Sequence, residues 1–140
     1  MDYEYPDEIT SDQMFRAYGH SLQEVFINAA KAMFGVMYDL EEVQVETSVR
    51  VTAQGETIEQ LLYDWLSNLL IEFEVEGVFF KDFSFDTFEE QKGPPFHLTG
   101  QAMGGCAMPE LQTHVKGVTF YRFALERVNN QYIATVVVDV

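Results

Sequence analysis

The sequence has a single cysteine and few basic residues. Cys106 has no partner among the 140 residues, which excludes an intramolecular disulfide and the disulfide-framework class of small secreted domains. Eight Lys and Arg stand against 23 Asp and Glu, giving a formal net charge of −15. Proteins that bind nucleic acid by themselves neutralise phosphates with clustered Lys and Arg. We therefore expect no direct binding of RNA or DNA and no docking on an anionic membrane.

Long apolar runs are also missing. No stretch reaches the roughly 18 to 20 apolar residues that span a bilayer. The first eight residues, Met-Asp-Tyr-Glu-Tyr-Pro-Asp-Glu, are acidic and lack the apolar segment of a signal peptide. These absences predict a cytoplasmic protein. Hydrophobic residues still make up 47% of the sequence, too much for intrinsic disorder, so residues 1–140 are expected to fold as a single domain.

Two segments have the apolar periodicity of amphipathic helices. Apolar residues recur at i, i+3, i+4 and i+7 over 22–37 and again over 58–73. Each run follows a capping-box pair, Ser21 with Glu24 and Thr57 with Gln60, in which each side chain can accept a hydrogen bond from an exposed amide of the other. Both stripes are typical of core packing.

The remaining regular segments read as strands. Residues 43–54 alternate apolar and polar, as expected for a sheet with one solvated face. Similar segments lie at 78–88, 96–103, 115–128 and 131–139, with shorter aromatic ones at 3–5 and 14–18. Asn129-Asn130 suits a tight turn because Asn tolerates positive φ. Strands interrupted by two helices predict an α+β fold: one mixed or antiparallel sheet with both amphipathic helices packed on one face.

The common enzymatic motifs are absent from the sequence. It has no Walker A loop, dinucleotide-type glycine fingerprint, paired-cysteine zinc spacing or HExxH. Cys106 could act as a nucleophile with His97 or His114 as its base, but the neighbouring residues give this no support. A lone Cys is more often a small buried or loop residue. Lys116 is a cation in an acidic chain, and taken alone it reads as an exposed strand lysine.

The C-terminus brings two carboxylates together. A strongly apolar segment, residues 133–138, is followed by Asp139 and by Val140, where the sequence ends. A central strand would hold the Asp139 side chain and the terminal α-carboxylate close to each other. Two neighbouring carboxylates repel, so one takes up a proton or a cation joins them. Oxygen ligands of this kind favour Ca²⁺ or Mg²⁺ over zinc.

Residues 8–12 read Glu-Ile-Thr-Ser-Asp, and residues 115–119 read Val-Lys-Gly-Val-Thr. These segments resemble the acidic-x-Thr-Ala-Asp motif and the Val-Lys-Ala-Val-Thr strand of the archease family, small acidic proteins that assist tRNA splicing. Similar matches occur at 16–19, 21–26, 29–34, 61–66 and 138–140. The sequence departs from the common pattern at four positions: Ile9, Met14, His114 and Tyr121.

The resemblance implies a divalent-metal site that joins the chain ends. Its ligands map to Asp12, Asp139 and the Val140 carboxylate, with Ca²⁺ favoured over Mg²⁺, and Lys116 maps to a candidate for the activating surface. It also implies that the chain is not an enzyme. The expected role is activation of the GTP-dependent RNA-splicing ligase in tRNA splicing, promoting guanylylation and multiple turnover.

Two other classes of function remain open at this point. One is a chaperone-like binding module that serves several RNA-processing enzymes, such as tRNA methyltransferases. The other is a small metal-dependent hydrolase that uses the same carboxylates, although the sequence suggests no nucleophile or general base for it. The acidic surface favours a protein partner or a cation in either case.

Overall fold

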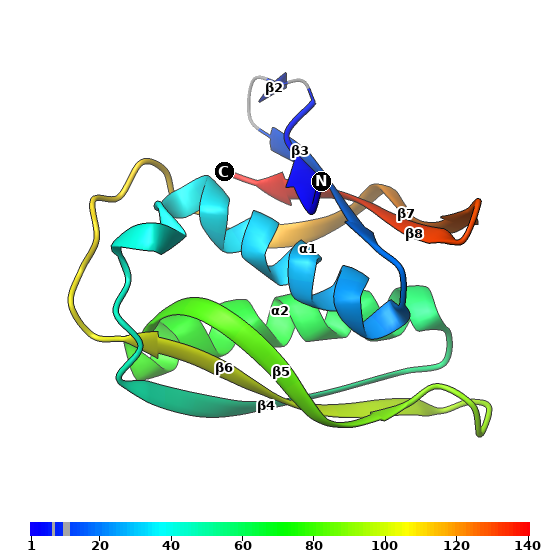
Figure 1. The fold of residues 1–140 in the computed structure, drawn as a ribbon. Coiled ribbons are helices and arrows are strands. Elements are labelled where there is room, and N and C mark those ends of the chain that lie inside the picture. The colour runs from blue at the N-terminus through cyan, green and yellow to red at the C-terminus, as the bar shows by residue number, and fades with distance from the viewer. Residues whose placement is uncertain (7, 10–11) are drawn as a thin grey trace. The chain divides into compact units, whose positions relative to one another are not determined.

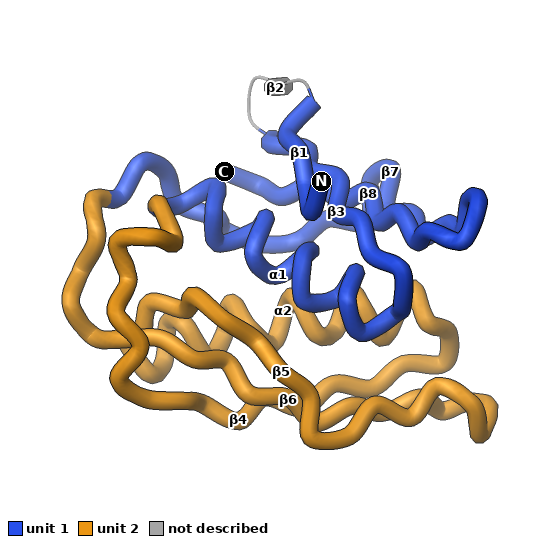
Figure 2. The backbone as a smooth tube through the Cα atoms, in the orientation of Figure 1, with its two compact units in different colours: residues 1–38, 111–140 blue, residues 39–110 orange. Residues whose placement is uncertain are grey.

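The computed structural model describes residues 1–6, 8–9 and 12–140, with residues 8–9 as backbone only. Thr10 and Ser11 of the acidic motif lie outside the described residues. Figure 1 shows the helices and strands, and Figure 2 divides the chain into two compact units. Unit 1 comprises Met1–Tyr38 and Leu111–Val140, and unit 2 comprises Asp39–Glu110.

Unit 1 is an antiparallel sheet with one helix. Its elements are β1 (Tyr3–Glu4), β2 (Glu8–Ile9), β3 (Asp12–Gly19), α1 (Leu22–Met37), β7 (Gly117–Val128) and β8 (Gln131–Asp139). The strand order is β1-β3-β8-β7, and β2 also pairs with β3. The apolar strand β8 lies between β3 and β7, and its residues Val136, Val137 and Val138 have no exposed surface. The expected central position of the C-terminal strand is confirmed.

Unit 2 is a second antiparallel sheet with its own helix. It contains a 3₁₀ turn (Leu40–Glu42), β4 (Thr47–Gly55), α2 (Ile58–Glu76), β5 (Phe79–Glu89) and β6 (Phe96–Gly105), with strand order β4-β6-β5. Trp65 of α2 is fully buried, with its ring centroid 5.0 Å from that of Phe85. Gly100 of β6 makes room for this indole, because a Cβ there would lie 2.9 Å from the ring.

Both helices begin where the sequence predicts. The Ser21 Oγ accepts a hydrogen bond from the Glu24 amide (3.1 Å), and the Thr57 Oγ1 accepts one from the Gln60 amide (3.1 Å). The return bond differs slightly from the usual capping box. Glu24 accepts from the amide of His20 rather than of Ser21, one residue before the cap, and Gln60 likewise accepts from the amide of Glu56.

The α+β class is confirmed, but the expectation of one sheet with both helices on one face is wrong. The described strands form two sheets, and each helix packs mainly on a strand of its own unit, α1 on β3 and α2 on β4. Apolar alternation reveals which residues face a core, whereas the choice of strand partners depends on long-range pairing that alternation does not encode. The hairpin between β7 and β8 is confirmed, with φ of 52° at Asn129 and 64° at Asn130.

Two strands are shorter than expected. Residues 43–46 precede β4. The Val43 amide closes the 3₁₀ turn by donating to the Leu40 carbonyl (3.1 Å), and the Glu46 amide already donates to the Gly104 carbonyl of β6 (2.8 Å). Residues 115–116 precede β7, although the Lys116 amide still donates to the carbonyl of Asp139 (2.7 Å).

Candidate functional site

Two of the predicted metal ligands lie opposite each other in unit 1. Asp12 at the start of β3 pairs with Asp139 at the end of β8 in the antiparallel ladder. Directly opposite residues have Cβ atoms about 4.5–5.5 Å apart and point to the same face of the sheet. The two half-buried carboxylates are therefore close enough to share one cation. The ladder brings together residues that are 127 positions apart in the sequence.

The third strand at this end of the sheet leaves space beside Asp139. Gly117 of β7 is the register partner of Asp139 on the side away from Asp12, and a Cβ at Gly117 would meet no heavy atom within 4 Å. The half-buried Val140 follows Asp139 directly, so a chain that ends at Val140 carries its α-carboxylate one residue away. Lys116 is exposed, and its amide bond to the Asp139 carbonyl fixes its backbone at the same end.

This donor set fits a hard divalent cation. Carboxylate oxygens are the ligands that Ca²⁺ takes, and Ca²⁺ tolerates irregular geometry. Two facing carboxylates also repel, so a cation between them relieves an unfavourable pair. Within the described residues, no cluster of three or more His, Cys, Asp or Glu side chains suits a metal. The predicted set has only two such side chains, and its third ligand is a main-chain carboxylate.

The structure does not assemble the alternative nucleophile and base within unit 2. His97 is the second residue of β6, and Cys106 follows the last residue of that strand. At about 3.3 Å per residue, the eight residues from His97 to Gly105 separate the strand's ends by about 26 Å. Cys106 and His97 are both exposed and lie too far apart for proton transfer.

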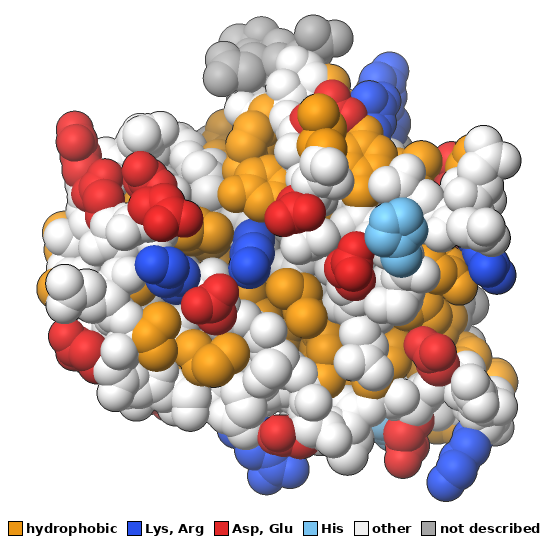
Figure 3. Space-filling view, in the orientation of Figure 1, with side chains coloured by type: hydrophobic (Ala, Val, Ile, Leu, Met, Phe, Trp, Pro, Cys, Tyr) orange, Lys and Arg blue, Asp and Glu red, His pale blue; other side chains and the backbone are white. Residues whose placement is uncertain are grey.

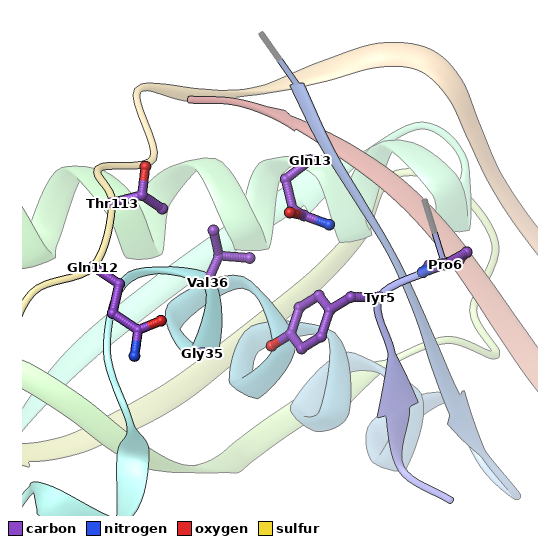
Figure 4. Close-up of a pocket in the computed structure, with 7 residues that line it drawn as sticks. All are labelled: Tyr5, Pro6, Gln13, Gly35, Val36, Gln112 and Thr113. Atoms are coloured by element: carbon purple, nitrogen blue, oxygen red, sulfur yellow. The ribbon is translucent and has the colours of Figure 1, made fainter. Parts of the chain in front are cut away.

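A pocket of about 530 Å³ lies on the other face of the same sheet (Figure 4). Side chains alternate along a strand, so Gln13, which lines this pocket, points away from the face of Asp12. The lining residues are uncharged: Tyr5, Pro6, Gln13, Gly35, Val36, Gln112 and Thr113. The pocket therefore offers amide and hydroxyl groups but no carboxylate for a metal.

Tyr5 forms one wall of the pocket and is fixed by α1. Its hydroxyl donates to the Ala32 carbonyl (2.8 Å), and a Cβ at Gly35 would lie 2.5 Å from that hydroxyl. Burial raises the pKa of Tyr5 well above its usual value of 10, and the neighbouring Tyr3 adds to the effect. Tyr5 thus remains neutral at physiological pH and serves as a structural wall.

Strand β7 contains an irregularity that the regular strand predicted over residues 115–128 does not include. Thr119 pairs with Val137 and Ala124 pairs with Thr135, so four residues of β7 face Val136 alone. We call residues 120–123 the β7 bulge. Its signal in the sequence is the run Phe-Tyr-Arg-Phe, which breaks the two-residue alternation of a strand.

The surface agrees with the acidic composition. Acidic side chains are spread over the face drawn in Figure 3, with fewer basic side chains between them. Among the described helices, none is long and apolar enough to cross a membrane.

Comparison with known proteins identifies the family. A sequence model of the archease protein family matches residues 3–140. Protein archease of Methanosarcina mazei is 40% identical over 141 residues, covering 99% of this chain and 95% of that protein. The solution structure of protein 1598 of Methanobacterium thermoautotrophicum is similar, with a TM-score of 0.83, 38% identity, and coverage of 99% of this chain and 98% of that one.

A more distant structure shares the fold. The crystal structure of an archease, described as a possible chaperone, from Thermotoga maritima has a TM-score of 0.59 at 20% identity, over 98% of this chain and 97% of that one. With the family model matching almost the whole sequence, the chain belongs to the archease family.

Proposed function

We propose that the chain is a non-enzymatic activator of a GTP-dependent RNA-splicing ligase in tRNA splicing, acting in the cytoplasm. It promotes guanylylation of the ligase and allows multiple turnover. The observation that carries the proposal is the pairing of Asp12 with Asp139 in a chain of the archease family. These are the two side chains that the family resemblance assigns to the metal.

In this proposal Asp12, Asp139 and the Val140 α-carboxylate hold one divalent cation, with Ca²⁺ favoured over Mg²⁺. Mg²⁺ usually keeps several waters and is bound through one or two carboxylates, whereas Ca²⁺ accepts more protein oxygens in flexible geometry. The bound cation neutralises part of the charge of the carboxylates and links strand β3 to strand β8. A C-terminal extension past Val140 moves the α-carboxylate away and is expected to weaken Ca²⁺ binding.

The acidity of the chain supports a proposal in which the ligase binds the RNA and this chain binds the ligase. The ligase holds the RNA, and a chain with a net charge of −15 can bind the ligase without competing for phosphate. Lys116, exposed beside the carboxylate pair, is the candidate residue for activation. No catalytic residue is assigned to the chain.

The test is transfer of label from GTP to the cognate ligase, with this chain present in substoichiometric amounts. The native chain is expected to accelerate guanylylation and to sustain it over repeated turnovers. Asp12→Ala and Asp139→Ala variants that stay folded are expected to lose this effect. An active ligase whose guanylylation is unchanged by the native chain would refute the proposal.

A second candidate is a chaperone-like binding module for several RNA-processing enzymes, such as tRNA methyltransferases. It draws on the description of the Thermotoga maritima structure as a possible chaperone. Quantitative pull-down with the purified chain separates the two proposals. Capture of several RNA-processing enzymes without the ligase favours the chaperone-like module, and selective capture of the ligase favours the activator.

A further inference from the structure

The β7 bulge presents aromatic side chains to solvent. Phe120 is 64% exposed and Tyr121 55% exposed, although both are large apolar groups. The Phe120 and Phe123 rings meet edge to face with centroids 6.2 Å apart. Arg122 is exposed, and its guanidinium lies 5.3 Å from the centroid of the Tyr121 ring. Tyr, Phe and Arg are enriched in the buried centres of protein interfaces.

The backbone of the bulge is held in an unfavourable conformation. Arg122 has a φ of 54°, a left-handed value that is uncommon for residues with a Cβ. Such conformations persist where the surroundings impose them, and they cluster at functional sites. Gly or Asn would meet this backbone requirement at lower cost. The presence of Arg therefore suggests that its side chain serves a purpose there.

The segment that contains the bulge has a charge opposite in sign to that of the whole chain. Residues 115–128 contain three basic residues, Lys116, Arg122 and Arg127, and one acidic residue, Glu126, for a net charge of +2. The rest of the chain therefore carries −17. This basic and aromatic segment is complementary to a surface that offers carboxylates among apolar residues, since the Arg fork binds carboxylates well.

A protein fits this segment better than RNA does. Stable binding of a nucleic acid backbone requires many neutralised phosphates, and three basic residues on a strongly acidic molecule supply little of that energy. A pair of exposed aromatic rings with one Arg is instead enough for an interface anchor, because a few such residues carry most of the binding energy between proteins.

The bulge lies close along β7 to the end of the sheet that holds Asp12 and Asp139, where we propose that the chain activates the ligase. Gly117, the register partner of Asp139, begins β7, and Phe120 follows three residues later, about 10 Å along the strand. A typical interface buries about 800 Å² on each partner, a patch roughly 30 Å across. A partner of that size that covers the edge strand β7 can reach both the bulge and the end of the strand beside Asp139.

We infer that the β7 bulge is the anchor by which the ligase docks, through an acidic patch with apolar edges, while the Asp12–Asp139 end acts on guanylylation. This inference rests on the proposed function, since it takes the ligase as the partner. It separates affinity from activation: the bulge sets how tightly the ligase binds, and the carboxylate end sets how fast the bound ligase reacts.

The experiment is a titration of the cognate ligase with the chain, following label transfer from GTP and, separately, direct binding by calorimetry without GTP. Arg122→Gly removes the side chain and suits the positive φ, and Phe120→Ala removes an exposed ring. Each is expected to raise the half-maximal concentration and the Kd about tenfold or more, leaving the plateau rate unchanged. Arg50→Ala and Val75→Ala, exposed residues of unit 2, are the matched controls and should leave both quantities unchanged.

Several results would overturn the inference. An unchanged Kd in both bulge variants would do so, as would a lowered plateau at unchanged Kd, because that result assigns the bulge to activation rather than docking. Binding of labelled single-stranded RNA by the chain alone, lost in Arg122→Gly, would assign the segment to RNA. If the native chain binds the ligase through the bulge but does not accelerate guanylylation, the docking inference stands and the proposed function fails.

Discussion

Asp12 lies directly opposite Asp139 in the antiparallel ladder between β3 and β8. Like charges in this arrangement destabilise a sheet, so the pair weakens unit 1 unless something neutralises it. A divalent cation bound between the two carboxylates makes the pair stabilising instead of destabilising. The consequences for stability can be measured without the ligase.

The first prediction concerns this reversal. Without metal, Asp12→Asn removes the repulsion and should raise the free energy of unfolding by about 0.2–1 kcal/mol. With Ca²⁺ at about 100 times its Kd, the native chain should gain about 2.7 kcal/mol that the variant lacks. The order of stability of the two proteins should therefore invert, as measured by urea unfolding with EDTA and with Ca²⁺.

The control for this inversion is Asp86→Asn. Asp86 is an exposed carboxylate of β5 that accepts a hydrogen bond from Gln101 (2.8 Å), which Asn can also accept. Ca²⁺ should stabilise the Asp86→Asn variant as much as it stabilises the native chain. Equal stabilisation of native and Asp12→Asn proteins by Ca²⁺ would place the cation elsewhere.

The second prediction concerns Tyr5 and pH. Burial raises its pKa in the folded chain above the unfolded value of 10, so above pH 10 the unfolded chain loses a proton that the folded chain keeps. The free energy of unfolding should then fall as the pH rises above 10, and this contribution should be fully present below pH 10. The Tyr5→Phe variant should lose less free energy of unfolding above pH 10, because it has no hydroxyl at this position.

Comparison of the two proteins isolates Tyr5 from the other tyrosines, including Tyr18, whose pKa is also raised, chiefly by its hydrogen bond to Glu4. Urea unfolding at pH 9, 10 and 11 measures the difference. At pH 7, Tyr5→Phe should cost about 0.5–1.5 kcal/mol, because the bond to the Ala32 carbonyl is lost. Parallel pH curves above pH 10 would show that the folded chain does not shield the Tyr5 hydroxyl from water.

The third prediction concerns the strain at Arg122. Gly adopts a φ of 54° without steric cost, so Arg122→Gly should leave the free energy of unfolding unchanged or raise it by up to about 1 kcal/mol. Arg122→Val, whose branched side chain disfavours this φ, should lower it. A large loss of stability in Arg122→Gly would mean that the side chain holds the fold together, which would remove the argument that it is retained for docking.

Much of the local structure could be predicted from the sequence. The helix from Leu22 to Met37 follows from its apolar stripe and the Ser21 cap, and the β7–β8 hairpin follows from Asn129-Asn130. These features depend on neighbouring residues. The division into two sheets could not be predicted, because it depends on which distant strands pair, such as β4 with β6 or β3 with β8.

The sequence supplies both side chains of the candidate site but not their pairing. The apolar run before Asp139 indicated a central strand, but only the register of β3 on β8 places Asp12 directly opposite. The family motif supplied Asp12 at the sequence level. The strand predicted over residues 115–128 does not include the β7 bulge, although Phe120-Tyr121-Arg122-Phe123 interrupts the alternation.

The most direct test of the proposed metal site is a calorimetric titration with Ca²⁺ of the chain ending at Val140. The Asp12→Asn and Asp139→Asn variants are titrated alongside it, with Asp86→Asn as control. One Ca²⁺ site is expected in the native and control proteins, and a loss of affinity of tenfold or more is expected in each of the two variants. If both variants bind Ca²⁺ as tightly as the native chain, the paired carboxylates are not the metal site.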